Sequence, residues 1–272
     1  MSEFLWLLPA GFVLGAYGTL IGAGGGFLLV PLLILLYPSD SPHTVATISL
    51  SVVFVNALSG SIAYARMRRI DYKSGLLFST ATVPGAIVGA LVTDHMPRRP
   101  FDLMVGVLML AICVFLLRPP SAGATAGKGR WVLRRRLVEA DGTAHEYAYN
   151  PVLGVSMSLG VGFLSSLLGI GGGIIHVPVM ANLLHFPVHL ATATSHFTLA
   201  IMTLAGVGVH GLEGDFTGVF DRIVPLSIGV AVGAQGGALL AKWVGGVWII
   251  RALVAALAFV GARLVLLAWH GG

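Results

Sequence analysis

Two clusters of glycine interrupt apolar stretches of the sequence, Gly22–Gly26 within GAGGGFLLVP and Gly169–Gly173 within GIGGGIIHVP. The apolar segments that begin there, 26–37 and 173–184, provide only roughly 18 Å of helix, too little to cross a hydrocarbon layer about 30 Å thick. A helix that begins after such a break has free backbone N–H groups and partial positive charge at its first turn. This predicts the binding of a small anion. The expected backbone ligands are Gly24, Gly25, Gly26, Gly171, Gly172 and Gly173.

Polar side chains repeat at helical spacing in the apolar segments behind the glycine clusters. Ser49 and Asn56 are separated by seven positions, and so are His196 and Thr203, so each pair shares one face of a helix. We expect the anion site to be lined by Ser49, Asn56, Ser195, His196 and Gln235. For the two amides, Asn56 and Gln235, an interhelical hydrogen bond is the alternative role.

Two histidines fall at positions where an ionisable side chain in a membrane protein indicates function. His176 follows the second glycine cluster, where the first half of the chain has Leu29, and His196 follows Ser195. Either imidazole is able to contact the anion or to relay a proton. A helix N-terminus favours the neutral imidazole, so His176 would serve as a hydrogen-bond donor.

The remaining candidate histidines lie near segment ends, where an interfacial position is the simpler interpretation: His43, His185, His189 and His210. We expect no metal site, because Pro187 interrupts the helical spacing of His185 and His189 and no carboxylate lies nearby. We expect no nucleotide cofactor either. Phe27 stands where a dinucleotide-binding loop has its third glycine, and neither glycine cluster is followed by Lys-Ser or Lys-Thr.

Glycine in membrane helices also serves close helix packing, and this is the interpretation we give to scattered glycines. Gly85 and Gly89 belong to this group, as do Gly233 and Gly237. A triplet repeated in both halves is more than packing requires, so there we favour the anion site.

The composition requires a membrane environment for these segments. The chain has 272 residues, of which 56% are hydrophobic and 10% charged, whereas soluble domains have about 25% charged residues. The net charge of +5 indicates loops facing an anionic membrane surface rather than a nucleic-acid partner. Glu3 near the start argues against a cleaved signal peptide, and the single cysteine, Cys113, is expected to be a packing residue.

The apolar segments form two groups of five, separated by a polar linker, Arg118–Pro151. The segments lie near 4–20, 26–37, 43–65, 73–93, 101–117, 151–168, 173–184, 189–210, 222–241 and 248–269. Alternation within the linker predicts a pair of strands joined by a two-residue turn at Asp141 and Gly142. We therefore predict membrane repeats at 1–118 and 151–272 and a cytoplasmic linker at 119–150.

The two halves resemble each other in sequence, which indicates an internal duplication. Besides the glycine clusters, HTVATISL from His43 matches HLATATSH from His189, and GAIVGALV from Gly85 matches GAQGGALL from Gly233. The basic loop 66–73 corresponds to a loop without this basic excess, 210–222, so the positive-inside rule gives the halves opposite orientation with both termini outside. We predict an all-α polytopic membrane protein of two inverted repeats. Each has a glycine-broken helix pair, re-entrant or discontinuous, followed by three transmembrane helices.

The paired glycine motifs, the helices TVATISLSVVFVNALSGSIAY and ATATSHFTLAIMTLAGVGVH and the charged linker resemble the sulfite exporter TauE/SafE family of membrane permeases. The resemblance covers nearly the whole chain except the linker. It implies transport of sulfite, sulfoacetate or another organosulfur anion. The functional residues of the family would correspond in this chain to Gly22–Gly26, Gly169–Gly173, Ser49 and Ser195. The family usually has threonine before the serine. Thr194 fits this pattern and Ile48 departs from it.

We therefore expect a secondary transporter, not an enzyme, in a bacterial cytoplasmic (inner) membrane. It would move a small sulfur-containing anion by alternating access at a midplane site, driven by the anion gradient or by coupled protons or sodium. The alternatives are a membrane-embedded enzyme using Ser165 or Ser166, for which no Gly-x-Ser-x-Gly elbow is present, and a membrane sensor or scaffold, which would not need two broken helices. Substrate identity, direction, coupling ion and oligomeric state are left open by the sequence.

Overall fold

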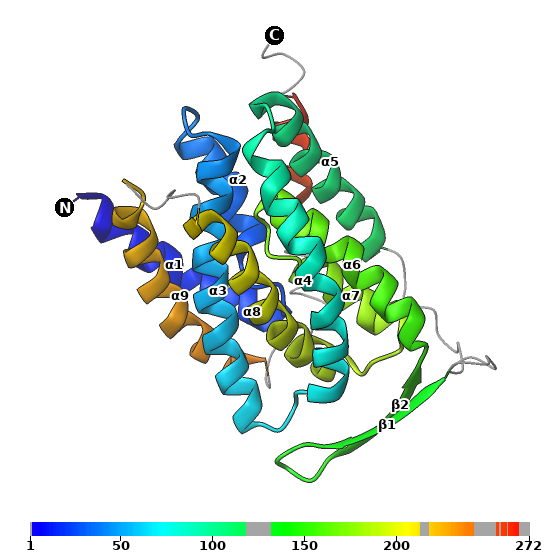
Figure 1. Ribbon diagram of the computed structural model, residues 1–272. Coiled ribbons are helices and arrows are strands. Elements are labelled where there is room, and N and C mark those ends of the chain that lie inside the picture. Colours follow the sequence, from blue (N-terminus) through cyan, green and yellow to red (C-terminus); the bar gives the residue numbers. More distant parts are fainter. Residues whose placement is uncertain are drawn as a thin grey trace.

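The computed structural model describes residues 2–117, 132–212, 218–241, 254–255, 257–259 and 261–266 (Figure 1). In chain order its elements are α1 (Ser2–Ile21), α2 (Gly26–Leu36), α3 (Pro42–Arg66), α4 (Tyr72–Asp94), α5 (Arg98–Leu117), β1 (Leu133–Val138), β2 (Ala144–Tyr149), α6 (Pro151–Leu168), α7 (Gly173–Pro178), the π-helical turn η1 (Val179–Leu183), α8 (Val188–Leu212) and α9 (Phe220–Leu240). Half of the predicted last segment, 248–269, lies outside the described residues.

Within the described residues, five helices are long and apolar enough to cross a membrane: α3, α4, α6, α8 and α9. Their starts follow from local sequence. Ser41 caps the first turn of α3 and Asn150 that of α6, and in both helices proline occupies the first turn, where its missing N–H costs nothing. The helical membrane architecture predicted from composition is thus supported.

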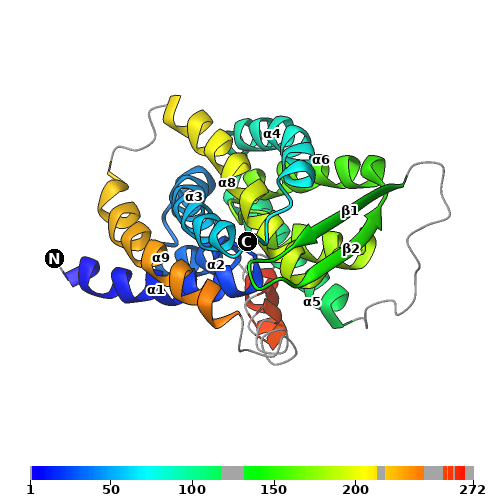
Figure 2. The ribbon, with the colours of Figure 1, turned by 90° about the horizontal axis from the view of Figure 1, so that it is seen from below.

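The long helices form a layered bundle around α3 and α8 (Figures 1 and 2). These two helices lie side by side and antiparallel, since Gly60 contacts His196 while His43 contacts His210. Helix α9 flanks α3 and carries α1 on its outer side, and helix α4 flanks α8 and carries α6. The principal hydrophobic core includes residues of both halves of the chain.

Scattered glycines form the two outer helix contacts, as predicted. A Cβ on Gly233 of α9 would lie 2.1 Å from the carbonyl oxygen of Phe12 in α1. A Cβ on Gly85 of α4 would lie 2.3 Å from the carbonyl oxygen of Leu159 in α6. One turn further along, Gly89 is crowded in the same way by Phe163 of α6, and Gly237 by Ala16 of α1. The contact between α1 and α9 corresponds to the contact between α6 and α4 in the sequence repeat, because Phe12 and Leu159 occupy matching positions before the glycine clusters.

Both glycine clusters break the helix, and both following helices are short, as the sequence predicts. Residues 22–25 and 169–172 are not helical. Helix α2 has 11 residues and α7 has 6, continued by the 5 residues of η1. Figure 1 places the loop between α3 and α4 and the hairpin at one end of the molecule, and the start of α9 at the other.

The linker forms the predicted pair of antiparallel strands, but the predicted two-residue turn is wrong. Val138 pairs with Ala144, so five residues connect the strands. The N–H of Glu139 donates to the carbonyl of Thr143 at 2.9 Å, and Asp141 accepts from the N–H of Thr143 at 2.9 Å. These bonds close a longer loop around Gly142, whose φ is 90°.

Candidate functional site

The glycine clusters form two buried turns of the same backbone conformation, which we call tip 1 (residues 22–26) and tip 2 (residues 169–173). In tip 1 the φ angles of Gly22, Gly24 and Gly25 are 84°, 76° and 81°. The corresponding angles in tip 2 are 68°, 79° and 66° for Gly169, Gly171 and Gly172. Residues other than glycine rarely adopt this left-handed conformation. The backbone conformation therefore explains why the glycines recur in both halves of the sequence.

The two tips lie against each other, and the last glycine of each makes the closest approach. A Cβ on Gly26 would lie 2.6 Å from the carbonyl oxygen of Ile170, and a Cβ on Gly173 would lie 2.5 Å from that of Gly22. Neither glycine has a positive φ, so here the absence of a side chain, rather than backbone freedom, permits the contact. The structure therefore brings Gly24–Gly26 and Gly171–Gly173 together in one place.

The two predicted serines hold the tips in a reciprocal manner. Ser49 of the first half donates to the carbonyl of Gly169 at 2.6 Å, and Ser195 of the second half donates to the carbonyl of Gly22 at 3.5 Å. Both side chains are fully buried. Their hydroxyl protons are thus used to position the backbone turns, and the predicted role of both serines as direct anion ligands stays a prediction.

Tip 1 presents hydrogen-bond donors for which the described residues provide no acceptor. The backbone N–H groups of Gly25, Gly26 and Phe27 at the start of α2 have no partner there, and Gly25 has no side-chain cap. Asn56, also fully buried, has an unpartnered Nδ2 that would lie 3.8 Å from a Cβ on Gly25. These donors converge on the positive end of α2.

A chain of polar groups orients Asn56 toward this tip. Thr19 Oγ1 donates to Asn56 Oδ1 at 3.0 Å, and His196 Nε2 lies 3.3 Å from Thr19 Oγ1. Tyr64 closes the cluster by donating to the carbonyl of Thr19 at 2.8 Å, with its ring edge-on to His196. Since the carboxamide oxygen accepts from Thr19, its nitrogen is left to donate toward the tip.

Tip 2 borders a small cavity of about 10 Å³, roughly the space for one water molecule. The residues lining it include Gly171, Gly172, Gly173, His176, Ser195 and Thr198. His176 Nε2 lies 3.2 Å from Ser158 Oγ. The hydroxyl of Ser165, unpartnered in the described structure, would lie 2.8 Å from a Cβ on Gly172.

Among the predicted ligands, Gln235 lies apart from both tips. Its Nε2 donates to the carbonyl and hydroxyl oxygens of Ser59 at 2.7 and 2.8 Å, which joins α9 to α3. An interhelical hydrogen bond of this kind is the alternative role that we considered for Gln235 from the sequence. Of the other predicted side chains, Asn56 and His196 lie at tip 1 and His176 lies at tip 2. Ser195 contacts both, since it donates to Gly22 and lines the cavity beside tip 2.

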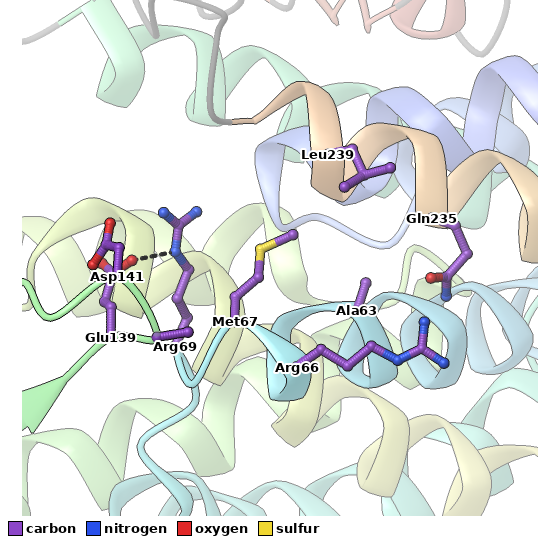
Figure 3. Close-up of a pocket in the computed structure, with 9 residues that line it drawn as sticks. Ala63, Arg66, Met67, Arg69, Glu139, Asp141, Gln235 and Leu239 are labelled. Carbon is purple, nitrogen blue, oxygen red and sulfur yellow. Dashed lines mark hydrogen bonds and ion pairs between the residues drawn. The ribbon is translucent and has the colours of Figure 1, made fainter.

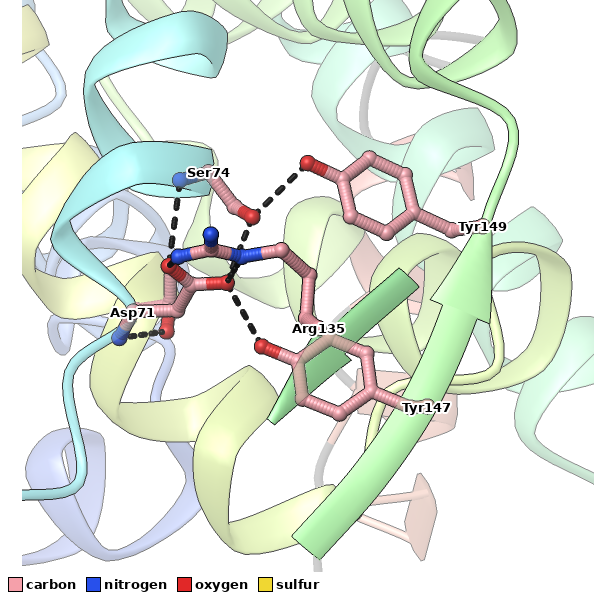
Figure 4. A network of polar contacts seen from close by, with 6 residues as sticks. Asp71, Ser74, Arg135, Tyr147 and Tyr149 are labelled. Carbon is pink, nitrogen blue, oxygen red and sulfur yellow. Dashed lines mark hydrogen bonds and ion pairs between the residues drawn. The ribbon is translucent and has the colours of Figure 1, made fainter. Parts of the chain in front are cut away.

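The hairpin is fixed to the membrane helices through Asp71, a contact that the sequence did not reveal (Figure 4). Asp71 caps α4 by accepting from the N–H and hydroxyl of Ser74, and it also accepts from Arg135 Nε at 3.0 Å and from the Tyr147 hydroxyl at 2.6 Å. Burial alone would raise the pKa of Asp71, but the hydrogen bonds from Arg135, Ser74 and Tyr147 outweigh it and lower that pKa to about 2. Burial and the adjacent carboxylate raise the pKa of Tyr147.

Aromatic contacts extend from the hairpin to tip 2. Phe186 lies between the two hairpin tyrosines, with ring centroids 4.5 Å from Tyr147 and 5.0 Å from Tyr149. Phe78 contacts Tyr149 at 5.7 Å and His176 at 5.6 Å. The hairpin therefore covers the end of the molecule nearest to His176.

A second feature missed by the sequence is a buried histidine pair at the opposite end from the hairpin. His210 Nδ1 lies 2.7 Å from His43 Nε2, and the two rings are edge-on. Both residues were expected at the membrane interface, yet they pack against each other between α3 and α8. Helical spacing cannot reveal this pairing, because the two residues lie far apart in the sequence. The described residues contain no group of three metal-ligating side chains.

Comparisons with known proteins agree with the membrane architecture. Residues 7–264 match the family model described as “Sulfite exporter TauE/SafE”. The chain is similar to “Probable membrane transporter protein YunE” of Bacillus subtilis (strain 168), with 33% identity over 218 residues, covering 78% of this chain and 80% of the relative. It is also similar to “Probable membrane transporter protein MJ0441” of Methanocaldococcus jannaschii, with 26% identity over 240 residues, covering 85% and 82% respectively. No solved structure matches the chain.

Proposed function

The chain belongs to the sulfite exporter TauE/SafE family of membrane transporters, and we propose that it is a secondary carrier of a small sulfur-containing oxyanion such as sulfite or a short sulfonate. The observation that carries this proposal is the group of buried, unpartnered donors at tip 1, namely the first N–H groups of α2 and the amide nitrogen of Asn56. Buried donors without acceptors are costly, and an anion with several oxygen atoms would satisfy them together.

The charge of the anion would be met without a bound metal or a lysine. Neither tip includes Lys or Arg among the residues whose contacts are described above, so the helix dipole and neutral donors would supply the stabilisation. Thr19 and His196 would hold Asn56 in the donating orientation. Ser49 and Ser195 would keep the turns in shape through their carbonyl bonds.

The mechanism we propose is alternating access, with the two halves related as inverted repeats and rocking about the tips. Reciprocal contacts support this arrangement, since each half supplies one tip and one serine that binds the tip of the other half. The glycine clusters lack a nucleotide-binding lysine, so a gradient of the anion, protons or sodium would drive transport. Basic loops at the hairpin end favour placing that end in the cytoplasm, with the protein in the cytoplasmic membrane.

Flux measurements in proteoliposomes test the proposal with sulfite, sulfate, thiosulfate and methanesulfonate. Replacing Asn56 by leucine should reduce anion flux at least about tenfold, since a hydrogen bond to a charged group contributes about 1.5–3 kcal/mol. Ser51→Ala is the matched control, because Ser51 is also buried on α3 but bonds only to its own helix at Thr47. Transport of cations or neutral solutes without these anions would refute the proposal, and release of a chemically altered substrate would indicate an enzyme.

A further inference from the structure

A pocket of about 340 Å³ opens at the hairpin end of the molecule, separate from both tips (Figure 3). It is formed by the end of α3, the following loop, the connection between the two strands and the end of α9. Figure 3 shows Arg66 beside Gln235 on one side and Arg69 with Glu139 on the other. Met67 lies between these two sides. The pocket is large enough for a small hydrated ligand.

The charges in this pocket are only partly paired. Arg69 Nε donates to Glu139 at 2.6 Å, and Glu139 also contacts His145 at 2.9 Å, so this carboxylate is engaged twice. Arg69 is largely buried, and its Nη1 has no hydrogen-bond partner among the described residues. Arg66 has no carboxylate partner there either. Asp141, the second acid in the lining, accepts from its own turn at Thr143.

The surface around the pocket is also basic. The loop 66–73 and the described linker residues 132–150 contain seven lysine and arginine residues against four aspartate and glutamate residues. An excess of one sign of charge around a cleft raises the local concentration of ions of the opposite sign, and here the excess is three positive charges. The pocket therefore favours an anion over a cation or a neutral solute.

The pocket and tip 1 are joined along one face of α3. Arg66 and Ala63 line the pocket, Ser59 binds the pocket residue Gln235, and Asn56 faces tip 1. These four residues are spaced three or four positions apart, so they lie on one face over about 15 Å of helix. Next to Ala63, the Tyr64 hydroxyl donates to Thr19 of the tip cluster.

We infer that this pocket is a second anion-binding site, at the mouth of the transport route on the hairpin side, with Arg66 as its ligand and Arg69, whose Nη1 is unpartnered, as a second positive charge on the opposite side. The inference rests on the proposed function for the identity of the anion, a small oxyanion or sulfonate. An anion would bind first in this wide, hydrated pocket. It would then pass Tyr64 to reach the buried donors at tip 1, and the reverse order would apply to movement in the other direction.

The site is testable without transport by a reporter cysteine, Met67→Cys, in a Cys113→Ala background. The anionic reagent sulfonatoethyl methanethiosulfonate should react faster than its cationic trimethylammonioethyl analogue, and millimolar methanesulfonate should slow the anionic reagent. Adding Arg66→Gln should lower the anionic-to-cationic rate ratio about fivefold, as expected for the loss of one partly screened charge, and should abolish protection. Arg68→Gln is the matched control, because it removes the same charge from the same loop but Arg68 does not line the pocket.

Equal rate ratios in the Arg66→Gln and Arg68→Gln proteins, or protection that survives Arg66→Gln, would overturn the inference. Arg66→Lys should restore the ratio, since the positive charge is what attracts the reagent. In proteoliposomes Arg66→Gln should raise the KM for methanesulfonate from the hairpin side. Protection of Met67→Cys without any anion flux would support the anion site in the pocket and refute the proposed function. Anion flux without protection would support the proposed function and overturn the site in the pocket.

Discussion

Substitution of Gly26 by alanine tests whether the tips are a binding site or only a packing contact. The new Cβ would lie 2.6 Å from the carbonyl oxygen of Ile170 and 2.7 Å from Val53 Cγ2, whereas ordinary Cβ contacts begin at 3.4 Å. The tips must therefore separate by about 0.8 Å, the difference between 3.4 and 2.6 Å. Overpacking of this kind costs about 1–3 kcal/mol, partly offset by the helix preference of alanine over glycine, up to about 1 kcal/mol.

The expected result is a small loss of stability and a large loss of affinity. The net destabilisation of about 1–2 kcal/mol corresponds to a fall in melting temperature of about 2–8 °C. Displacement of the first N–H groups of α2 should remove at least one charge-assisted hydrogen bond to the anion. At about 1.5–3 kcal/mol, this predicts an affinity for sulfite or methanesulfonate about 10- to 100-fold weaker. Calorimetric titration of the purified protein measures the affinity, and a fluorescence melting curve measures the stability.

Two glycines provide matched controls for Gly26→Ala. Gly233→Ala introduces a comparable clash, 2.1 Å from the carbonyl oxygen of Phe12, but at the contact between α1 and α9. It should lower the melting temperature and leave anion affinity unchanged in the folded protein. Gly208→Ala meets no atom within 4 Å, so it should leave anion affinity unchanged and should not lower the melting temperature, because only the helix preference of alanine acts inside α8. If Gly26→Ala lowers stability as Gly233→Ala does and leaves affinity intact, the tips are packing contacts and our reasoning is refuted.

Three further predictions concern the tip, the hairpin and the topology. Asn56→Asp would place a carboxylate beside the donors of tip 1, so anion flux should fall at least about tenfold, and unchanged flux would exclude Asn56 from the site. Arg135→Gln should weaken the attachment of the hairpin to Asp71, leaving only the bond from Tyr147, and increase the mobility of a spin label at Ala144→Cys. In the parent protein the pKa of Asp71 is about 2, below its ordinary value of 3.8, so the label should stay immobile above about pH 4 and become mobile as the pH falls toward 2. An impermeant thiol reagent should modify Asp221→Cys in intact cells and Ala144→Cys only after permeabilisation, both in a cysteine-free background, and the opposite pattern would reverse the orientation.

The backbone features of the site were predictable because each depends on a local pattern. A glycine triplet before a short apolar segment indicates both the break and the positive φ values, and Pro42 and Pro151 mark helix starts within one residue of the predicted bounds. The strand pair in the linker was likewise visible from alternation. Its turn was misplaced because the loop is closed by a bond between Glu139 and Thr143 rather than by Asp141 and Gly142 alone.

The partners of the polar side chains were not predictable, because they lie far away in sequence. Helical spacing placed Ser49 and Asn56 on one face, yet the partner of Ser49 is a carbonyl 120 residues later. The same limit applies to Asp71, whose position before a helix indicates a cap but not the contact with Arg135. Gln235 was assigned to the site from its central place in a segment, and only the packing of α9 on α3 determines that it binds Ser59.

The reciprocal bonds of Ser49 and Ser195 affect how the chain is made. The first half of the chain is synthesised before Gly169 and Ser195. The carbonyl of Gly22 and the hydroxyl of Ser49 therefore lack these hydrogen-bond partners until the second half has been made. The turn at tip 1 therefore gains its bond from Ser195 only after the second half has been synthesised. A chain truncated in the linker would leave both the carbonyl of Gly22 and the hydroxyl of Ser49 without these partners.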